Sequence, residues 1–444
     1  MKIVIAGAGE VGTHLAKMLS RDDHDIILFD EGKEKLSTIS SSLDVMTISG
    51  STLSFDDLKD TDIANSDLFI AVTPYEDRNI VACQLAKHLG TKKAVARIDN
   101  QEFLFPQNRE FFTALGIDEL IYPEHLAAKE IIAHIKQTST RQIFEFSGGK
   151  LVLFAVKIRE NASLINIPLH DLTHELDNFR VVAISRDSET IIPHGNDLIL
   201  KDDLVFFVSK PALVDSILQK AGKEKFVVKN VMILGGSRIG MKTALRLGDS
   251  FNIKIIEQNK ERSLKVAEKV SHALVINGDG RDLELLKSEG IEQMDAFVAV
   301  TGNSEANILS CQLAKKMGVK RTIAEVENID YIDFAERIGI GGVINKKLLA
   351  ASYIYRYTMN AEVSHVKCLT ASDAEALEFV VKEGAKVTKY PLRDLDFPKE
   401  ATIGGYIRDN QGHIANGNTQ ILAGDRVVVF TRPDALKKLS KYFK

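Results

Sequence analysis

The stretch Lys2-Ile-Val-Ile-Ala-Gly-Ala-Gly-Glu-Val-Gly12 opens the chain and decides its fold. Its apolar start predicts a strand, and the pattern Gly7-x-Gly9-x-x-Gly12 follows that strand and begins an amphipathic helix. Gly7 permits the tight turn, Gly9 lets a pyrophosphate lie against bare backbone, and Gly12 lets the helix pack closely on the strand. The helix N-terminus adds free N–H groups and a positive dipole. The stretch predicts a nucleotide-binding Rossmann unit, with a ligand-free strand-to-helix turn as the alternative.

The sequence contains an internal repeat in which each half is one copy. The second copy carries the glycine loop as Gly235-Gly236-Ser237-Arg238-Ile239-Gly240, so Gly240 corresponds to Gly12. The same offset recurs along the first part of each copy, becomes shorter before Gly116, and shortens again near the end of the chain. Self-similarity over this length indicates a duplicated architecture. Matching pairs are Gly50 and Gly278, Thr73 and Thr301, Asn79 and Asn307, Cys83 and Cys311, Gly116 and Gly339, and Asp203 and Asp425.

Each copy divides into a βαβ-patterned domain and a smaller β-rich domain. In the first copy, apolar strands alternate with helical patterns, which indicates a parallel sheet covered on both faces. Residues 103–136 are predicted to form two further helices, with Phe111 and Phe112 on an apolar face. The fold class is therefore α/β: two tandem Rossmann-type doubly wound parallel sheets, each followed by a small α+β domain. We predict four domains, at residues 1–138, 139–222, 223–360 and 361–444, with boundaries in polar stretches.

Composition excludes several classes of function. The 444 residues are 45% hydrophobic and 27% charged, which is typical of globular proteins with several cores. No apolar run approaches the ~18–20 residues that cross a bilayer, and the strand predicted at residues 2–6 leads us to expect that the protein is not exported. A net charge of −4 disfavours nucleic-acid binding. Three dispersed cysteines fit a reducing compartment, so we expect a cytoplasmic protein.

Two acidic residues end the second strands of the two copies. Asp30 follows the loop of Gly12, and Glu257 follows the loop of Gly240, at nearly equal spacing along the chain. Dinucleotide-binding motifs place an acidic residue roughly 20 residues after the glycines, where its carboxylate accepts hydrogen bonds from ribose hydroxyls and repels a 2′-phosphate. This pattern favours NAD, ADP or ATP over NADP. A solvated strand-end turn is the alternative.

The two nucleotide sites are not expected to be equivalent. Ser237 stands where the first copy has Gly9, so close pyrophosphate contact is in doubt there. Its hydroxyl and Arg238, aligned with Glu10, could contact phosphates, which leads to the hypothesis of a different nucleotide preference. A degenerate, empty second site is the equal alternative.

Further crevice residues follow the other strands, because ligands of open parallel sheets lie at the carboxyl ends of the strands. They are Gly50, Gly278 with Asp279, Thr73-Pro74 and Thr301-Gly302. Arg97 could reach a phosphate, or could pair with Asp99 or Asp77; its counterpart is Glu325.

No catalytic or metal site is predicted. Cys83 and Cys311 share a helix position among Val, Ala, Leu and Ile, and are interpreted as small buried hydrophobes. The 11 histidines show no metal-ligand spacing, and no nucleophile motif is found. Each Rossmann unit is followed by only a small module rather than by a larger catalytic domain. Binding without turnover is the simpler interpretation, so an enzyme is not expected.

With these features in hand, the chain resembles the peripheral NAD-binding subunits of bacterial Trk potassium-uptake systems, which contain two RCK domains. The resemblance covers essentially all 444 residues. It rests on residues 2–12, Ala71-Val-Thr73, Asn79–Gln84, Ala96-Arg97-Ile98 and Ala306-Asn307-Ile308. It implies that NAD(H) is held in the first site by Gly7, Ala8, Gly9, Glu10, Val11, Asp30, Thr73, Pro74 and Arg97. In the second site, NAD(H) or ATP/ADP would be held by Gly235, Gly236, Ser237, Arg238, Ile239, Glu257, Thr301 and Gly302.

The resemblance also implies an assembly. Members of this family form tetramers whose eight Rossmann domains make a ring under an integral membrane potassium-translocating subunit, and ligand binding changes the shape of the ring. The chain would then be peripheral at the inner face of the cell membrane. Two alternatives stay open: a soluble NAD-dependent oxidoreductase, and a redox-sensing transcription repressor, for which no basic recognition helix is found at either end.

Overall fold

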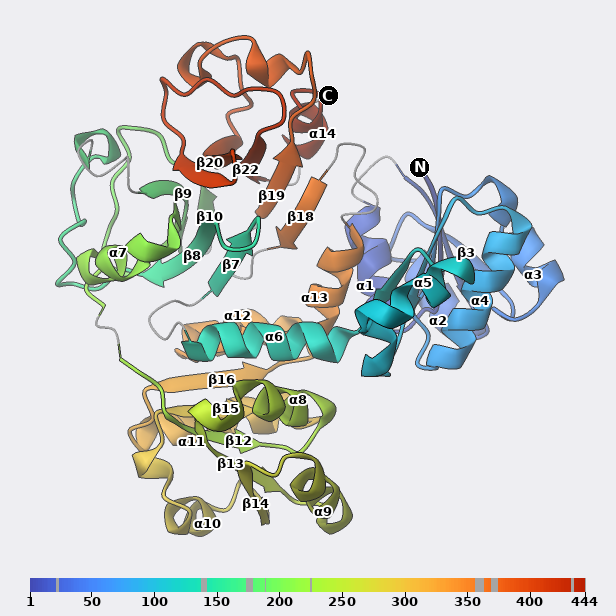
Figure 1. The fold of residues 1–444 in the computed structure, drawn as a ribbon, viewed down its shortest axis with the longest axis horizontal. Helices are drawn as coiled ribbons and strands as arrows, with labels where there is room; N and C mark the ends of the chain where they lie inside the picture. The colour runs from blue at the N-terminus through green and yellow to red at the C-terminus, as the bar shows by residue number, and fades with distance from the viewer. Residues whose placement is uncertain are drawn as a thin grey trace. The chain divides into compact units, whose positions relative to one another are not determined.

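A computed structural model gives the fold of the chain, which Figure 1 shows as a ribbon. The structure describes residues 1–20, 24–136, 142–172, 179–187, 189–223, 226–355, 363–368, 374–432 and 435–443. It divides into two compact units, the first of residues 1–127 and 346–359 and the second of residues 128–345 and 360–444. The predicted domain boundaries near 138 and 360 lie outside the described residues.

The first unit contains a six-stranded parallel sheet in the order β3-β2-β1-β4-β5-β6. This order is that of a Rossmann sheet, and the turn at its switch point carries the first glycine loop. The strands are β1 (Lys2–Ala6), β2 (Asp25–Asp30), β3 (Met46–Ser49), β4 (Leu68–Ala71), β5 (Lys93–Arg97) and β6 (Glu119–Ile121). The helices are α1 (Glu10–Leu19), α2 (Lys33–Ser40), α3 (Phe55–Asp60), α4 (Glu76–Leu89) and α5 (Pro106–Ala114).

The last strand of this sheet was not predicted from the sequence. Residues 103–136 were predicted as two helices, but β6 lies between α5 and α6 (Pro123–Lys136). So short a strand cannot display a periodicity, so β6 has no signal of its own. The predicted apolar face is also half wrong: Phe112 is buried, but Phe111 is 61% exposed. Neighbouring helical residues point about 100° apart, so both cannot face the same core.

The second unit contains the second Rossmann sheet, in the order β14-β13-β12-β15-β16-β17. Its central strands β12 and β15 consist mainly of buried apolar residues, as expected for a parallel sheet covered on both faces. The strands are β12 (Asn230–Leu234), β13 (Asn252–Glu257), β14 (Ala273–Asn277), β15 (Ala296–Ala299), β16 (Arg321–Glu325) and β17 (Gly342–Ile344). The helices are α8 (Arg238–Leu247), α9 (Lys260–Lys269), α10 (Leu283–Ser288), α11 (Ser304–Lys316) and α12 (Asp330–Arg337).

The helix that follows the second Rossmann sheet belongs to the first unit. This helix, α13 (Lys346–Tyr355), packs on α1, the helix of the first glycine loop. Its buried residues include Ala350, Ala351 and Ile354. At the edge strand of the first sheet, the Tyr353 hydroxyl donates to the Glu119 carboxylate at 3.2 Å. The second copy therefore contributes an element to the first Rossmann unit.

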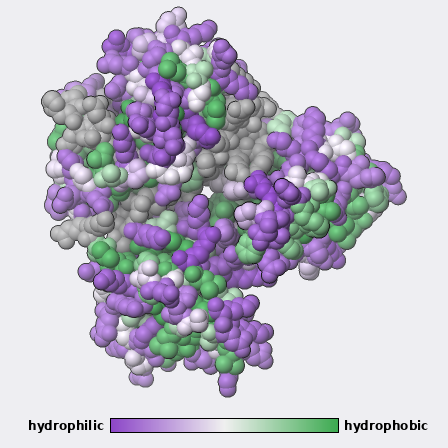
Figure 2. All heavy atoms as spheres, in the orientation of Figure 1, coloured by the Kyte–Doolittle hydropathy of each residue, from purple (hydrophilic) through white to green (hydrophobic). Residues whose placement is uncertain are grey.

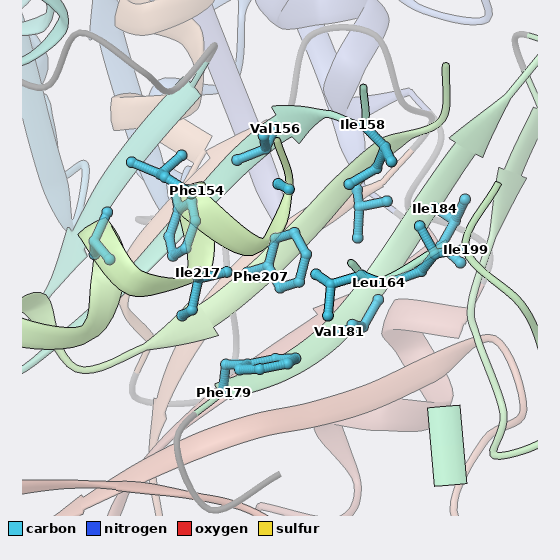
Figure 3. Packing of buried hydrophobic residues seen from close by; sticks show 14 of the residues in the cluster. Phe154, Val156, Ile158, Leu164, Phe179, Val181, Ile184, Ile199, Phe207 and Ile217 are labelled. Atoms are coloured by element: carbon cyan, nitrogen blue, oxygen red, sulfur yellow. The ribbon is translucent and has the colours of Figure 1, made fainter. Parts of the chain in front are cut away.

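The first small domain is an antiparallel sheet in the order β10-β9-β11-β8-β7, closed by a helix. Figure 3 shows its core, in which Ile217 of the helix lies over Phe154 and Phe207 of the sheet. The Phe154 and Phe207 rings stack at 5.6 Å between centroids. The elements are β7 (Gln142–Phe146), β8 (Leu151–Lys157), β9 (Phe179–Arg186), β10 (Glu189–Ile191), β11 (Leu204–Ser209) and α7 (Val214–Lys220).

The second small domain repeats this topology as β18-β19-β22-β20-β21, so the predicted fold class is confirmed. The two small domains share a core in the second unit, where the Phe206 and Phe430 rings lie 5.8 Å apart. The elements are β18 (Val363–Cys368), β19 (Glu375–Val380), β20 (Ala401–Arg408), β21 (Gln411–Ile414), β22 (Arg426–Thr431) and α14 (Leu436–Ser440).

The same ion pair, between a partly exposed arginine and a buried aspartate, occurs in both small domains. Arg186 donates from Nε and a terminal nitrogen to the two Asp203 oxygens at 2.9 and 2.8 Å, and Arg408 does the same to Asp425 at 2.9 and 2.7 Å. Both aspartates are 2% exposed. Hydrogen bonding to the aspartates raises the pKa of both guanidinium groups. A bidentate, charge-assisted pair fixes the strand ends in the same way in each copy.

The exposed surface is that of a polar protein. On the face drawn in Figure 2, hydrophilic residues predominate and hydrophobic ones are interspersed. None of the helices in the described residues is long and apolar enough to cross a membrane.

Candidate nucleotide-binding sites

The first glycine loop has the shape that close phosphate contact requires. Gly7 has φ +114°, a left-handed backbone that favours glycine, and its N–H donates to the Phe29 carbonyl at 2.8 Å. A Cβ on Gly12 would lie 1.9 Å from the Gly7 carbonyl oxygen, so no side chain fits there. A Cβ on Gly9 would meet nothing within 4 Å. The backbone at Gly9 is therefore open toward the space where the motif places a pyrophosphate.

Helix α1 begins at this open position without a side-chain cap. Gly9 is its N-cap residue and provides no side-chain hydrogen bond to the first turn. The first N–H groups of a helix have no partner within the helix, and anions are favoured there. Ala8 and Val11 are buried, so only their backbones can contribute to a ligand site, whereas Glu10 is exposed.

Asp30 holds the glycine loop from the end of β2. Its two oxygens accept from the Ala8 N–H at 2.7 Å and from the Gly32 N–H at 2.8 Å. The residue is half-buried and is not a solvated turn. A carboxylate has about four lone-pair positions, so two remain for ribose hydroxyls. The position predicted for ribose recognition is therefore fixed against the phosphate loop.

Gly50 lies beside Asp30, where its N–H donates to the Asp30 carbonyl at 3.1 Å. A Cβ at Gly50 would lie 2.8 Å from the Phe29 ring and 2.9 Å from Asp57. Asp57 also accepts from the Ser51 N–H at 2.7 Å. Gly50 is therefore required by packing against the end of the second strand.

Asn79 connects the loops after β4 and β5. Its oxygen accepts from the Thr73 N–H at 2.9 Å and from the Thr73 hydroxyl at 2.6 Å. Its amide nitrogen donates to the carbonyls of Thr73 at 3.0 Å and Arg97 at 2.9 Å. Asn79 is fully buried, so these four hydrogen bonds satisfy it. The structure thus brings together the predicted crevice residues Thr73 and Arg97, and leaves Pro74 exposed beside them.

Arg97 faces a carboxylate that the sequence analysis did not suggest. A terminal nitrogen of Arg97 lies 4.0 Å from a Glu124 oxygen at the start of α6. The two side chains are 20% and 10% exposed. The Arg97 Nε and Glu124 Oε2 atoms are buried without a hydrogen-bond partner. The pair is loose, which leaves the guanidinium able to turn toward another anion.

The second glycine loop has the same backbone but a different surface. Gly235 has φ +109°, and a Cβ at Gly240 would lie 2.1 Å from the Gly235 carbonyl oxygen. Ser237 caps α8: its oxygen accepts from the Gly240 N–H at 3.3 Å and its hydroxyl donates to the Val300 carbonyl at 2.8 Å. The hydroxyl proton is thus engaged within the protein. Arg238 is exposed at the loop, and Ile239 is buried.

Glu257 accepts hydrogen bonds in the second site as Asp30 does in the first, but its carboxylate is more enclosed. Its oxygens accept from the Gly236 N–H and the Asn259 N–H, both at 2.8 Å. Arg262 lies 3.7 Å from the same carboxylate. Glu257 is 5% exposed, and a Cβ at Gly236 would lie 2.9 Å from Val266 and 3.1 Å from the Glu257 carboxylate. The acidic end of the second site is therefore more enclosed than that of the first.

The remaining residues of the second crevice follow the first copy in part. Asn307 binds Thr301 and the Glu325 carbonyl as Asn79 binds Thr73 and the Arg97 carbonyl. A Cβ at Gly278 would lie 2.5 Å from Leu285, and Gly302 is open. The Asp279 carboxylate is held by the Arg281 guanidinium at 3.0 and 2.7 Å. This hydrogen bonding lowers the pKa of Asp279.

Three contacts of the first site were not predicted from the sequence. Asn79 was noted only as a repeated residue, although it organises the crevice. Glu76 accepts from the Asp99 and Asn100 N–H groups, both at 2.8 Å, and Lys347 of α13 forms an ion pair with Glu10 of the glycine loop. Polar residues repeated at the start of a helix could have indicated Asn79. Lys347 carries no local signal, because its partner lies near the other end of the chain.

The two described cysteines lie in the apolar interior. Cys83 and Cys311 are fully buried and donate to the Val95 and Ile323 carbonyls at 3.4 and 3.3 Å. Burial raises the pKa of both thiols, to about 12 for Cys311. Both are therefore buried small side chains, as predicted. Among the residues that the structure describes, no group of three or more His, Cys, Asp or Glu could hold a metal ion.

The fold and the two loops define a class: proteins with two tandem Rossmann-type units of the nucleotide-binding kind, each joined to a small α+β domain. Comparison with known families agrees with this class. The TrkA-N domain matches residues 3–123 and 231–346, and the TrkA-C domain matches residues 153–222 and 376–444. The chain belongs to the TrkA family of Trk system potassium uptake proteins.

Relatives match over the whole length. Trk system potassium uptake protein TrkA homolog 2 of Methanosarcina mazei is 32% identical over 455 residues, which cover 100% of both chains. The TrkA protein of Vibrio alginolyticus is 32% identical over 437 residues, which cover 97% of this chain and 95% of that protein.

Solved structures share the fold. The RCK domain of GsuK superposes with a TM-score of 0.62 at 12% identity, covering 99% of this chain and 94% of that one. The GsuK channel bound to NAD has a TM-score of 0.61 at 12% identity, covering 99% of this chain and 78% of that one. GsuK bound to ADP has a TM-score of 0.52 at 11% identity, over 80% and 68% of the two chains.

Proposed function

We propose that this chain is a nucleotide-sensing regulatory subunit of a Trk-type potassium uptake system and not an enzyme. One observation carries the proposal: the first glycine loop has open backbone at Gly9, an uncapped helix start behind it, and a fixed carboxylate, Asp30, beside it. This is the arrangement that a dinucleotide needs for its pyrophosphate and ribose. Membership of the TrkA family supports the link to potassium transport.

The expected ligands are NAD(H) and the adenine nucleotides ADP and ATP. Asp30 would accept hydrogen bonds from ribose hydroxyls and repel a 2′-phosphate, which disfavours NADP. Arg97, in its loose pair with Glu124, would add positive charge near a phosphate. The GsuK structures that contain NAD or ADP support this choice for a protein with the same fold. For the second site, the capped loop and enclosed Glu257 favour weaker binding or a different nucleotide.

The regulatory mechanism would be a population shift. A nucleotide that makes better contacts in one arrangement of the domains stabilises that arrangement, and by no more than its difference in affinity. In a homotetramer arranged as a ring on the cytoplasmic side, such a change would act on an integral membrane potassium-translocating subunit. Purification of the tagged chain from membranes, followed by identification of the accompanying integral protein, tests the partner.

Asp30→Ala tests the ligand site directly. Removal of the carboxylate is expected to weaken binding of NADH and ADP by roughly tenfold or more, because the hydrogen bonds to ribose hydroxyls are lost. Isothermal titration calorimetry on the full chain gives the affinities, and thermal unfolding reports on the fold. Asp56→Ala, which removes a carboxylate on the 93% exposed Asp56 side chain, is the matched control. Equal affinities in wild type and Asp30→Ala would remove the first site from this proposal.

A further inference from the structure

A cation from the second copy lies at the first glycine loop. Lys347 is the second residue of α13, and its Nζ forms an ion pair with the Glu10 carboxylate. Glu10 is the first residue of α1 and directly follows Gly9, where the backbone is open. The Lys347 ammonium is thus separated from the start of α1 by no more than one glutamate side chain and an ion-pair contact.

The two partners of this pair are buried to very different degrees. The Lys347 side chain is 6% exposed, whereas that of Glu10 is 70% exposed. The packing of α13 on α1 fixes the position of the ammonium, because Ala350, Ala351 and Ile354 of the same helix are buried. Glu10 can leave the pair at small cost when another anion replaces it at the ammonium, since an exposed carboxylate remains hydrated. The desolvated ammonium is the fixed charge and Glu10 is the exchangeable partner.

The Glu10 carboxylate alone would oppose a phosphate at this helix start. Two anions within a few ångströms repel each other. When a buried cation lies between them, the carboxylate and the phosphate instead compete for hydrogen bonds from the same ammonium. The corresponding residues of the other copy, Arg238 for Glu10 and Glu124 for Lys347, carry the opposite charges. The sequence therefore keeps opposite charges at this pair of positions in both copies, although both signs are reversed.

We propose that Lys347 is a ligand-binding residue of the first nucleotide site, where it exchanges the Glu10 carboxylate for a nucleotide phosphate. The inference rests on the proposed function and extends it: helix α13, which follows the second Rossmann sheet, would sense whether the first site is occupied. The ligand class is a nucleoside di- or triphosphate, because the contact is made to phosphate and not to the base or ribose. An ion pair that only anchors α13 on α1 is the alternative.

Two substitutions separate these roles. Lys347→Gln removes the phosphate ligand, and is expected to weaken ADP binding by about tenfold while adenosine binding stays unchanged. Glu10→Gln removes the competing carboxylate, and is expected to strengthen ADP binding several-fold. A pair that only anchors α13 would be broken by either change, so both variants would then shift ADP affinity in the same direction.

Calorimetry on the full chain with adenosine, ADP and ATP measures these effects. Lys92→Gln is the matched control, because it removes a 73% exposed lysine that pairs with Asp67 at the amino ends of β5 and β4, away from the carboxyl ends of the strands. Opposite shifts for Glu10→Gln and Lys347→Gln support the proposal. Shifts of the same sign, equal losses for adenosine and ADP, or affinities equal to those of Lys92→Gln would overturn it. Should Lys347→Gln fold poorly, the exposed Glu10→Gln variant still decides by its sign.

The same titrations separate this inference from the proposed function. If wild type binds neither ADP nor ATP, both are lost. If wild type binds them and the two variants do not move in opposite directions, the nucleotide sensor stands and the role of Lys347 falls.

Discussion

The two glycine loops differ in how their helices begin. In the first, Gly9 leaves the start of α1 uncapped and open; in the second, Ser237 caps α8 and its hydroxyl donates to the Val300 carbonyl. The backbone around both is the same, down to the carboxylate that accepts from the second residue of each loop. The start of α1 has no side-chain cap for its N–H groups, whereas the start of α8 has one of its N–H groups capped within the protein.

Comparison of the two loops distinguishes the glycines that the strand-to-helix turn requires from the one that it does not require. The first and third glycines are required by the strand-to-helix turn in both copies, because left-handed backbone and close packing leave no room for a side chain. The second glycine has no such structural requirement: at Gly9 a Cβ would meet nothing. The open backbone at Gly9 is therefore the feature on which the proposed pyrophosphate contact depends.

The largest expected effect comes from the third glycine of each loop. Gly12→Ala and Gly240→Ala would place a Cβ 1.9 and 2.1 Å from a carbonyl oxygen, so the helix must move away from the strand. We expect each variant to lose about 3 kcal/mol of stability, the upper range for overpacking a core. Urea denaturation followed by circular dichroism measures the loss. A stable Gly240→Ala variant beside an unstable Gly12→Ala variant would show that the two turns are not built alike.

Much of this architecture could be predicted from the sequence, because periodicity and glycine spacing are local. The parallel strands, the duplicated glycine loops and the acidic strand ends follow from such patterns, and the structure has them. Strand β6 could not be found, since so short a strand between two helices shows no period. The Glu124 partner of Arg97 and the Lys347 partner of Glu10 depend on where α6 and α13 begin in space, which no local pattern specifies.

The next largest effect is expected from exchanging the third residues of the two loops, Gly9 and Ser237. Gly9→Ser is expected to weaken NADH binding by about tenfold, because a side chain and a capping hydroxyl would compete with the pyrophosphate for the start of α1. Its stability should change by only a few tenths of a kcal/mol, as for other exchanges between serine and glycine at an N-cap. Calorimetry and thermal unfolding on the same samples separate the two quantities.

The reverse exchange, Ser237→Gly, completes this test. It should open the second loop and raise nucleotide affinity there, or create binding where wild type has none. If Gly9→Ser binds NADH as wild type does, the third residue of the loop does not distinguish the two sites, and the difference must lie in Glu257 and its more enclosed surroundings.

The smallest effect concerns the loop after the third strand, where the copies use different contacts. The first copy ties Ser51 to Asp57 through a backbone N–H, whereas the second pairs Asp279 with Arg281. The Arg281 hydrogen bond lowers the pKa of Asp279 from its ordinary value of 3.8. The pair therefore contributes to stability above about pH 4, and the contribution disappears as the pH falls through the lowered pKa. Because the Arg281 side chain is 64% exposed, the contribution is small.

Asp279→Asn is accordingly expected to lower the unfolding temperature by no more than about 1 °C at pH 7. The difference from wild type should shrink as the pH approaches 3, and also in 1 M salt, because an exposed ion pair is screened. Thermal unfolding at pH 7, 5 and 3.5 measures this dependence. A difference that grows toward low pH would mean that the Asp279 carboxyl is stabilised in its protonated form. The loop would then be held by a contact other than the Arg281 pair.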